Sequence, residues 1–310
     1  PIVGAEELWR VRQDYSIFPS EYFKQPFDGK LLNRLTFECG RGCPYSCTYC
    51  GNTALQQTMN AGKSMVRLRS IDSIMENLKT LVNDLDIQVV SLIDECFFVK
   101  PKQWLQEFSK RYSEEIRIPF IIQTRAEMVK DDRIEILNKT NASFYQVGIG
   151  VESGSERILF DVCNRKTKIS AITKAFKVLS KYSHIRSCAL FMIGFPFETR
   201  EEIFQSIQLC REIKPTVAHV FIFQPLKGQR LREVCIEEGF ITGKEPQMSY
   251  TGGSILKMSQ ISQKRILNIR RVFMLYVRCE EKYYDDIKLC EDDFEANRHI
   301  YRKLVDLCGL

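Results

Sequence analysis

Three cysteines with short spacing are the residues of this sequence best suited to chemistry. Cys43, Cys47 and Cys50 form a CxxxCxxC pattern within the loop of residues 38–52. Thiolates clustered so closely bind zinc, hold an iron–sulfur cluster or cross-link as disulfides. Cys39 lies earlier in the same loop and offers a fourth thiol.

Counting ligands favours an iron–sulfur cluster over zinc. A structural zinc site takes four ligands, usually as two separated pairs, whereas the chain has no second CxxC and no HxxxH. Four ligands on one short loop would make a poor zinc ribbon. Disulfides are disfavoured because the cysteine pair Cys47 and Cys50 fits no redox-fold pattern and no secretory signal is seen. A cubane held by three thiolates leaves one iron open for a small molecule, and zinc remains the alternative.

Composition excludes several classes of protein. The 310 residues are 44% hydrophobic and 27% charged, which is ordinary for a globular chain able to bury a core. The net charge of +6 is spread thinly, so no nucleic-acid footprint is evident, and no apolar run is long enough for a membrane span. Twelve cysteines, mostly single, indicate buried thiols in a reducing cytosol, hence a cytoplasmic protein.

From residue 31 onward, short apolar runs alternate with amphipathic stretches. The apolar runs, expected to be buried strands, are Leu31–Glu38, Ile87–Asp94, Pro119–Ala126, Phe144–Glu152, Arg186–Gly194 and Val217–Phe223. The stretches with helical periodicity are Ser70–Asn83, Lys102–Ser113, Asp131–Thr140, Ser155–Val162, Ser170–Tyr182 and Thr199–Ile213. This repetition predicts an α/β fold with a parallel sheet and right-handed crossovers. Six units are too few for a complete eight-stranded barrel.

The remaining segments flank this region. Residues 1–30 are expected to form an irregular lead-in, with one short helix near Glu6–Arg12, that packs on the core. Residues 241–310 are expected to form a helical extension, with helices over residues 260–281 and 292–308. Its three cysteines match no cluster or zinc spacing and are expected to be core thiols: Cys279, Cys290 and Cys308.

Two helix starts carry a capping-box pattern. Ser153 with Glu156, and Thr199 with Glu202, each have a hydroxyl residue followed three positions later by a glutamate. This assigns the two glutamates a structural role.

The cysteine loop resembles the signature of the radical S-adenosylmethionine (radical SAM) superfamily. An aromatic residue, Tyr49, stands just before the last cysteine, and the string RGCPYSCTYCGN is similar to the cobalamin-binding branch. The resemblance covers roughly residues 31–240. It implies a partial (β/α)6 barrel, a 4Fe–4S cluster on Cys43, Cys47 and Cys50, and binding of S-adenosylmethionine near Tyr49.

The resemblance also assigns roles to residues that end the second and third strands. Asp94 and Glu95 stand where the family contacts the ammonium group of the cofactor, although one of them could instead cap a turn. Arg125, on one face with Gln123, is a candidate for the cofactor carboxylate or a substrate anion. A structural salt bridge is the alternative for Arg125.

The fourth strand carries the closest match. Glu152 and Ser153 lie where the family contacts the ribose hydroxyls, since one carboxylate can accept from both hydroxyls at once. Ser153 could serve only as a helix cap. Arg165, or its neighbour Lys166, matches a basic residue that neutralises the cofactor carboxylate, and a solvated basic turn is the alternative.

The last two strands are expected to surround the adenine. Gly194, followed by Pro196, resembles the turn whose backbone approaches the adenine. Phe223, with Phe221, would supply an apolar wall and backbone edges. The same aromatic side chains could be plain barrel core.

The expected activity is reductive cleavage of S-adenosylmethionine to a 5′-deoxyadenosyl radical, with a flavodoxin or ferredoxin as electron donor.

The cobalamin mark DxHxxG is absent, so either a cobalamin domain has been trimmed or this member works without it. The start at Pro1 favours trimming, and methyl transfer is then the leading reaction. Otherwise oxidation or rearrangement leads. A non-catalytic iron–sulfur protein is the second alternative, and the sequence does not identify the substrate.

Overall fold

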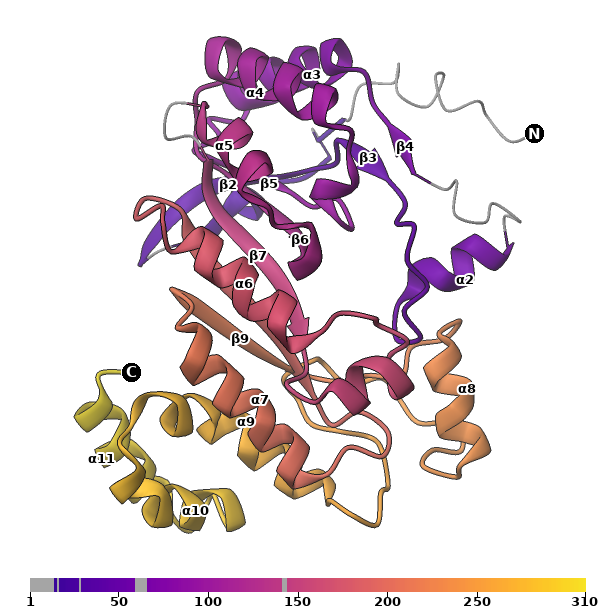
Figure 1. The fold of residues 1–310 in the computed structure, drawn as a ribbon, viewed down its shortest axis with the longest axis vertical. Helices are drawn as coiled ribbons and strands as arrows, with labels where there is room; N and C mark the ends of the chain where they lie inside the picture. The colour runs from indigo at the N-terminus through magenta and orange to yellow at the C-terminus, as the bar shows by residue number, and fades with distance from the viewer. Residues whose placement is uncertain (1–13, 16, 28, 59–65, 141–143) are drawn as a thin grey trace. The chain divides into compact units, whose positions relative to one another are not determined.

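The computed structural model describes residues 14–15, 17–27, 29–58, 66–140 and 144–310 (Figure 1). The helix expected near Glu6–Arg12 lies outside these residues. No helix within them has both the length and the apolar character needed to cross a bilayer.

A mixed sheet organises the described residues. It has seven strands in the order β1-β2-β5-β6-β7-β8-β9. Their bounds are β1 Lys24–Phe27, β2 Lys30–Phe37, β5 Val89–Leu92, β6 Phe120–Arg125, β7 Phe144–Glu152, β8 Arg186–Ile193 and β9 Val217–Ile222. Strands β2 and β5, β5 and β6, and β8 and β9 pair in parallel, whereas β1 pairs antiparallel with β2. All six predicted strands are confirmed, and so is the α/β fold class of a partial (β/α)6 barrel with C-terminal helices.

Helices lie between the strands and follow the last one. They are α2 Gly51–Thr58, α3 Ile71–Asp84, α4 Lys102–Glu115, α5 Asp131–Asn138, α6 Ile169–Leu179, α7 Arg200–Ile213, α8 Arg230–Glu237, α9 Gln263–Arg278, α10 Tyr284–Asp292 and α11 Arg298–Cys308. Those at α3 to α7 match the amphipathic periodicity. The stretch expected over Ser155–Val162 ends in a π-helical segment, Ile158–Val162. Helices α2, α8 and α10 were not predicted.

The two expected capping boxes have different outcomes. At α7 the Thr199 side chain accepts from the Glu202 amide, and Glu202 reaches back to Thr199, so this box is confirmed. The box at Ser153 is wrong. Ser153 Oγ accepts from the Ser155 amide, and Glu156 Oε1 accepts from the amide of Ile169 instead.

The chain divides into two compact units. The first comprises residues 1–44, 61–149 and 177–187. In it α3 packs beside α4, and α4 beside α5 (Figure 1). Aromatic rings fill the core between these helices and the strands, and Phe108 contacts Phe97, Trp104, Tyr112 and Phe120.

The start of the first unit is more regular than expected. A short 3-10 turn, Ser20–Phe23, leads into strand β1. Strand β1 pairs along its whole length with β2, from Lys24 opposite Asn33 to Phe27 opposite Lys30. A four-residue strand interrupted by Pro26 carries little periodicity, which explains why an irregular segment was expected.

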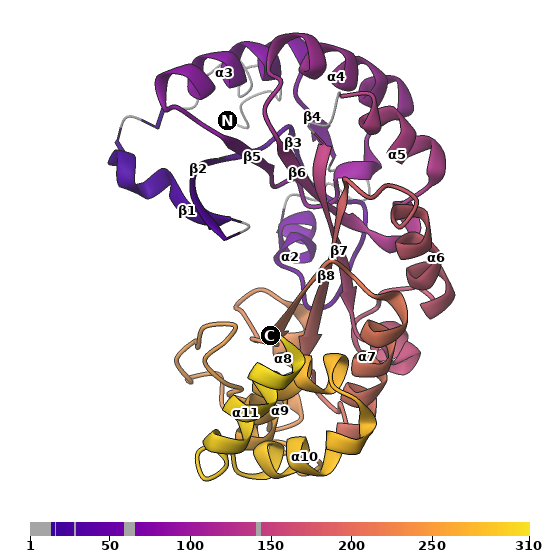
Figure 2. The same cartoon turned by 90° about the vertical axis from the view of Figure 1, so that its left-hand side faces the viewer.

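The second unit comprises residues 45–60, 150–176 and 188–310. Helix α9 packs against α7, β9, α10 and α11 (Figure 2). The buried Glu291 carboxylate holds these helices together, because it accepts from Arg200, Arg265 and the Tyr276 hydroxyl. A fully buried carboxylate is stable only when its charge is compensated in this way.

The expectation of core thiols in the C-terminal helices is wrong for two cysteines. Cys279, just after α9, and Cys308, at the end of α11, form a disulfide with Cα atoms 5.6 Å apart. Cys290 is a buried free thiol, as expected. The pairing was missed because a separation of 29 residues carries no spacing signal.

Candidate functional site

The first half of the cysteine loop belongs to the first unit. Strand β3, Gly40–Arg41, pairs antiparallel with β4, Arg67–Leu68, and so fixes the start of the loop. Gly42 then takes a φ of +97°, a backbone conformation that favours glycine. Its amide donates to both carboxylate oxygens of Glu95, at 3.1 and 3.0 Å. Glu95 thus fixes the backbone directly before Cys43.

Asp94 secures the same loop from the buried side. Its Oδ2 accepts from the Cys39 amide at 3.2 Å, and its Oδ1 forms an ion pair with Lys100 Nζ at 2.7 Å. The side chains of Asp94 and Lys100 are 3% and 1% exposed. The structure therefore shows Asp94 and Glu95 as supports of the cysteine loop, and their predicted contact with the cofactor ammonium stays a prediction.

Cys39 is buried beneath this loop. Desolvation by burial, and next the charge of Asp94, raise the pKa of its thiol well above the usual range. A thiol held protonated is a poor metal ligand, because thiolate sulfur is the coordinating form. This environment argues against Cys39 as a fourth ligand.

The second half of the loop belongs to the second unit. The Thr48 amide donates to the Cys163 carbonyl at 3.1 Å, and the Thr48 hydroxyl to the Val162 carbonyl at 2.6 Å. The amide of Leu231, in α8, donates to the Thr48 carbonyl at 2.9 Å. These three hydrogen bonds to backbone groups fix the position of Thr48, which lies between Cys47 and Cys50.

Tyr49 and Arg165 form the centre of the candidate site in this unit. Arg165 Nη1 donates to the Tyr49 hydroxyl at 3.3 Å, and Arg165 Nη2 to the Gly150 carbonyl at 2.5 Å. The Glu152 carboxylate lies 3.9 Å from Arg165 Nη1. Burial raises the pKa of the Tyr49 hydroxyl well above its usual range, although the Arg165 charge opposes the shift. A buried cation and a carboxylate therefore stand side by side at the end of β7.

The backbone at the end of β7 is shaped for this arrangement. A Cβ at Gly150 would lie 2.6 Å from Glu152 Oε1, so a larger residue here would force the carboxylate to move. Glu152 itself has a φ of +67°, which is strained for a residue with a side chain. Strain of this kind is held at functional sites by the surrounding structure.

The hydroxyl of Ser153, the residue after Glu152, is engaged in contacts with Ser155 and Ser206. The residue is fully buried, its Oγ accepts from the Ser155 amide at 3.1 Å, and it lies 3.5 Å from Ser206 Oγ. The position is that of a turn-stabilising residue. Its predicted ribose contact stays a prediction.

An aromatic row joins Tyr49 to the ends of the last two strands. The Tyr49 ring meets the Phe195 ring edge-on at 5.8 Å, and Phe195 stacks on Phe223 at 5.3 Å. The Phe223 amide donates to the Ile193 carbonyl at 2.9 Å. The fold thus brings together three residues that lie far apart in the sequence. Two of them, Tyr49 and Phe223, were among the predicted site residues.

Glu198 is a member of this region that sequence reasoning missed. It follows Gly194, which has a φ of +77°, and its Oε2 accepts from the amides of Gly194 and Phe195 at 2.6 and 3.2 Å. Burial raises the pKa of Glu198 to about 8 against the opposing effect of these two bonds. In the sequence the residue cannot be told from an ordinary acidic helix start, so no signal marks it.

Arg125, at the end of β6, belongs to the first unit. In the first unit it donates through Nε to Glu127 Oε1 at 2.5 Å and is 6% exposed. The structure shows the salt bridge that was the alternative reading. The predicted contact with an anionic group stays untested.

The three loop cysteines are chemically suited to a cluster. No three His, Cys, Asp or Glu side chains of the described residues stand close enough together to hold a metal ion. The loop passes from the first unit to the second after Pro44, with Cys43 before this point and Cys47 and Cys50 after it. All three lie outside the disulfide of Cys279 and Cys308, and thiolates are the ligands of iron–sulfur clusters. By chemical type the three thiols therefore fit an iron–sulfur cluster.

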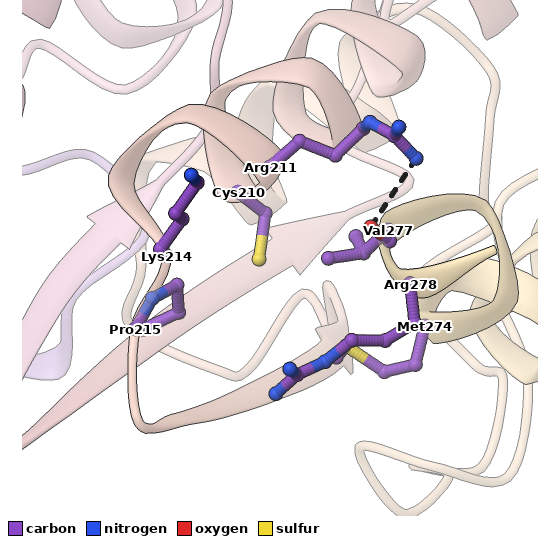
Figure 3. A pocket seen from close by; sticks show the side chains of 7 residues that line it. All are labelled: Cys210, Arg211, Lys214, Pro215, Met274, Val277 and Arg278. Atoms are coloured by element: carbon purple, nitrogen blue, oxygen red, sulfur yellow. Dashed lines mark hydrogen bonds between the residues drawn. The ribbon is translucent and has the colours of Figure 1, made fainter. Parts of the chain in front are cut away.

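A separate pocket of about 300 Å³ lies between the ends of α7 and α9 (Figure 3). Arg211 extends away from Cys210 and donates to the carbonyls of Val277 and Cys279 at 3.2 and 2.9 Å. These bonds satisfy the carboxyl end of α9, so the role of Arg211 here is structural. None of the predicted site residues lines this pocket.

Comparisons with known proteins agree with this geometry. The family model described as the Radical SAM superfamily matches residues 37–210. An uncharacterized methyltransferase of Pyrococcus horikoshii is 23% identical over 294 residues, which cover 94% of this chain and 59% of that protein. A ribosomal protein uS12 methylthiotransferase of Thermosipho melanesiensis is 24% identical over 63% of this chain and 47% of its own length. The chain thus spans about half the length of these relatives.

Solved structures show the same fold. The methyltransferase TsrM of Kitasatospora setae, solved with cobalamin and a [4Fe-4S] cluster, matches with a TM-score of 0.56 and 14% identity, over 70% of this chain and 41% of that one. The cobalamin-dependent enzyme OxsB, solved with aqua-cobalamin and S-adenosylmethionine, matches with a TM-score of 0.58 and 16% identity, over 84% and 46%. At these identities the likeness concerns the fold.

Proposed function

Because this chain belongs to the radical SAM superfamily, we propose that it binds a 4Fe–4S cluster through Cys43, Cys47 and Cys50 and cleaves S-adenosylmethionine reductively. The observation that carries the proposal is the link between Tyr49 and the end of β7. Arg165 joins the cysteine loop to Gly150 and Glu152 within one compact unit. An electron-transfer protein would have no need of a polar site built onto its cluster loop.

The residues around Arg165 supply groups that match the parts of S-adenosylmethionine. The buried guanidinium of Arg165 would bind the carboxylate of the amino acid end, since two parallel N–H donors suit a carboxylate. The Glu152 carboxylate would accept from the two ribose hydroxyls. Phe223 and the turn at Gly194 would contact the adenine through apolar surface and backbone edges.

The chain also excludes water around this site. Phe195 and Phe223 are buried, and the half-buried Tyr49 is in ring contact with Phe195, so the three rings would form an apolar wall. When bound, a reduced cluster supplies the electron that cleaves the sulfonium carbon–sulfur bond and leaves methionine and a 5′-deoxyadenosyl radical. A dry wall protects such a reactive species from side reactions. A flavodoxin or ferredoxin would act as the reductant.

Methyl transfer with cobalamin is the specific reaction that we favour. Two matches support it: the Pyrococcus horikoshii relative is named a methyltransferase, and TsrM is a methyltransferase solved with cobalamin. Cobalamin-independent oxidation or rearrangement is the other candidate, since the chain has no DxHxxG string.

The proposal is tested by anaerobic incubation of cluster-reconstituted protein with S-adenosylmethionine and dithionite, followed by mass spectrometry of the nucleosides. We expect 5′-deoxyadenosine from the wild type and none from Cys43→Ala, Cys47→Ala or Cys50→Ala. Cys39→Ala is the matched control and should keep the iron–sulfur absorbance. Loss of the cluster on replacing Cys39 would contradict the three-thiolate assignment.

Added cobalamin separates the two candidate reactions. Formation of S-adenosylhomocysteine only in its presence would support methyl transfer. Formation of 5′-deoxyadenosine alone, with and without cobalamin, would favour oxidation or rearrangement. A protein with an intact cluster that yields neither nucleoside would contradict the proposed activity.

A further inference from the structure

A second pocket opens in the first unit, at the carboxyl ends of β2 and β5. Its volume is about 330 Å³. Two strand ends contribute to it: Thr36 and Glu38 at the end of β2, and Ile93 directly after β5. In α/β folds the carboxyl ends of parallel strands are where ligands bind.

The pocket lies on a defined face of β2. Leu35 and Phe37 point to the buried side of the strand, where the Arg69 guanidinium lies 5.2 Å from the centre of the Phe37 ring. Side chains alternate along a strand, so Arg34 and Thr36 point to the opposite face. Both line the pocket. Its floor is therefore the strand face turned away from helix α3.

One wall consists of aromatic side chains from the segment before β1. Tyr15, Phe18, Tyr22 and Phe23 all line the pocket. The rings of Phe18 and Tyr22 are stacked at 4.6 Å, and these residues are 37% and 57% exposed. The Tyr15 hydroxyl donates to the Thr36 carbonyl at 2.7 Å, which ties this wall to the end of β2. Exposed, stacked rings on a tethered segment present flat apolar surface to a ligand.

The opposite edge of the pocket is polar and charged. Arg34 donates through Nε to Ser91 Oγ, which fixes the guanidinium against β5. Glu38 and Arg41 form an ion pair at 2.7 Å, and Gln25 adds a half-buried amide from β1. Donors and acceptors of both charges are thus present beside the flat aromatic wall.

The polar edge belongs to the loop that carries the cysteines. Glu38 and Arg41 lie a few residues before Cys43, and Ile93 directly precedes Asp94, which holds the Cys39 amide. A group bound in this pocket would be held by the same loop that binds the cluster.

We propose that this pocket recognises a planar aromatic group of the substrate, with its ring on Phe18 and Tyr22 and its polar edge on Arg34 and Glu38. The proposal rests on the proposed function and names a substrate class for it. A volume of about 330 Å³ is at the small end of the range of ligand pockets, about 300–1,000 Å³, so the pocket fits a one- or two-ring group and not a tetrapyrrole. A purely apolar ligand does not suit this pocket. It would displace water from the charged groups of the pocket edge and offer them no hydrogen-bonding partner in return.

The test measures binding of small probes to the full chain with its cluster reconstituted, by titration in ligand-detected NMR. Indole and phenol represent aromatic amino acid side chains, adenosine represents a nucleobase, and cyclohexanol is the saturated comparator. We expect at least one aromatic probe to bind about tenfold more tightly than cyclohexanol. We expect Phe18→Leu and Tyr22→Leu each to weaken that probe about tenfold, the order of one aromatic contact.

Two variants serve as controls. Tyr182→Leu makes the same kind of change before the amino end of β8, away from the carboxyl ends, and should bind the probe as wild type does. Phe18→Tyr keeps a ring at the stacking position and should also retain binding. The preferred probe then identifies the source of the aromatic group as an amino acid or a nucleobase.

Equal binding of aromatic and saturated probes would overturn the inference, and so would unchanged affinity in Phe18→Leu and Tyr22→Leu. The same preparations are assayed for 5′-deoxyadenosine, which separates this inference from the proposed function. Nucleoside formation without aromatic binding would overturn only the pocket. Aromatic binding without nucleoside formation would overturn only the proposed activity.

Discussion

Arg165 connects more parts of the candidate site than any other single residue considered above. Its guanidinium contacts the Tyr49 hydroxyl, the Gly150 carbonyl and the Glu152 carboxylate. The residue is 4% exposed, and a buried charge of this kind needs compensation from neighbouring groups. Its side chain therefore joins Tyr49 of the cysteine loop to the end of β7.

Arg165→Gln should reduce 5′-deoxyadenosine formation by about tenfold or more, because a charge-assisted hydrogen bond contributes roughly 1.5–3 kcal/mol. The nucleoside assay measures this, after iron–sulfur absorbance has been matched between proteins. Lys166→Gln makes the same substitution at the next position, where the ammonium lies over the Phe160 ring at 5.6 Å. That variant should retain full activity. If Arg165→Gln were as active as the wild type, Arg165 would not contribute to the binding site.

Glu198 makes the stability of the chain depend on pH. Burial raises its pKa from 4.5 to about 8, so the folded state holds a proton that the unfolded state releases between these pH values. The unfolding free energy must then fall as pH rises from about 5 to 8, by an amount on the order of 3–5 kcal/mol. The contribution is fully present below the unfolded pKa and is lost as pH passes the folded one.

Glu198→Gln should flatten this dependence, since the amide does not titrate and its oxygen can still accept from Gly194 and Phe195. Urea unfolding at pH 5.5 and 8.5 measures the difference. Glu245→Gln is the control: hydrogen bonds from the Thr242 backbone and neighbouring groups lower the pKa of Glu245 to about 2, so it is ionised throughout this window. A wild-type stability that does not fall between the two pH values would contradict the assignment.

At the scale of elements, periodicity predicted the strands and missed contacts between distant residues. The run Ile87–Asp94 is rich in β-branched residues, and β5 follows from it because a buried parallel strand needs an apolar surface on both faces. The pair of Tyr49 and Arg165 spans 116 residues, and each has an ordinary local context. A family resemblance pointed to both residues, but only the fold shows that they touch.

Elements whose boundaries depend on tertiary contacts were also missed. Helix α8 has eight residues and one of its amides, that of Leu231, bonds to Thr48 of the cysteine loop. So short a helix is not stable by propensity alone. It forms because the loop packs against it, and a single sequence does not reveal that contact.

The disulfide between Cys279 and Cys308 attaches the last helix to α9. Closing a segment of this length should stabilise the folded state by about 3–4 kcal/mol. We expect a reductant to lower the urea midpoint of the wild type, and Cys308→Ser to show the lower midpoint without reductant. Addition of reductant to Cys308→Ser is the control and should change nothing further. An unchanged wild-type midpoint, with alkylation confirming reduction, would show that the helices hold α11 without the bond.

At the scale of the whole molecule, the relation to cobalamin follows from comparing the chain with its relatives. The chain matches TsrM over 41% of that protein and OxsB over 46%, and both were solved with cobalamin. The radical SAM family model matches residues 37–210, which include the cysteine loop and the end of β7. The DxHxxG string is absent from the sequence of this chain.

We therefore expect the 310-residue chain to bind S-adenosylmethionine without retaining cobalamin. After incubation with hydroxocobalamin and desalting, the absorbance spectrum should show the iron–sulfur bands and less than about a tenth of an equivalent of corrin, because a chain without the DxHxxG string should bind the corrin weakly. Bound S-adenosylmethionine in the same preparation, measured by equilibrium dialysis, is the control for a folded site. Stoichiometric retention of corrin would contradict this prediction and would place cobalamin binding within these residues, which would strengthen methyl transfer as the reaction.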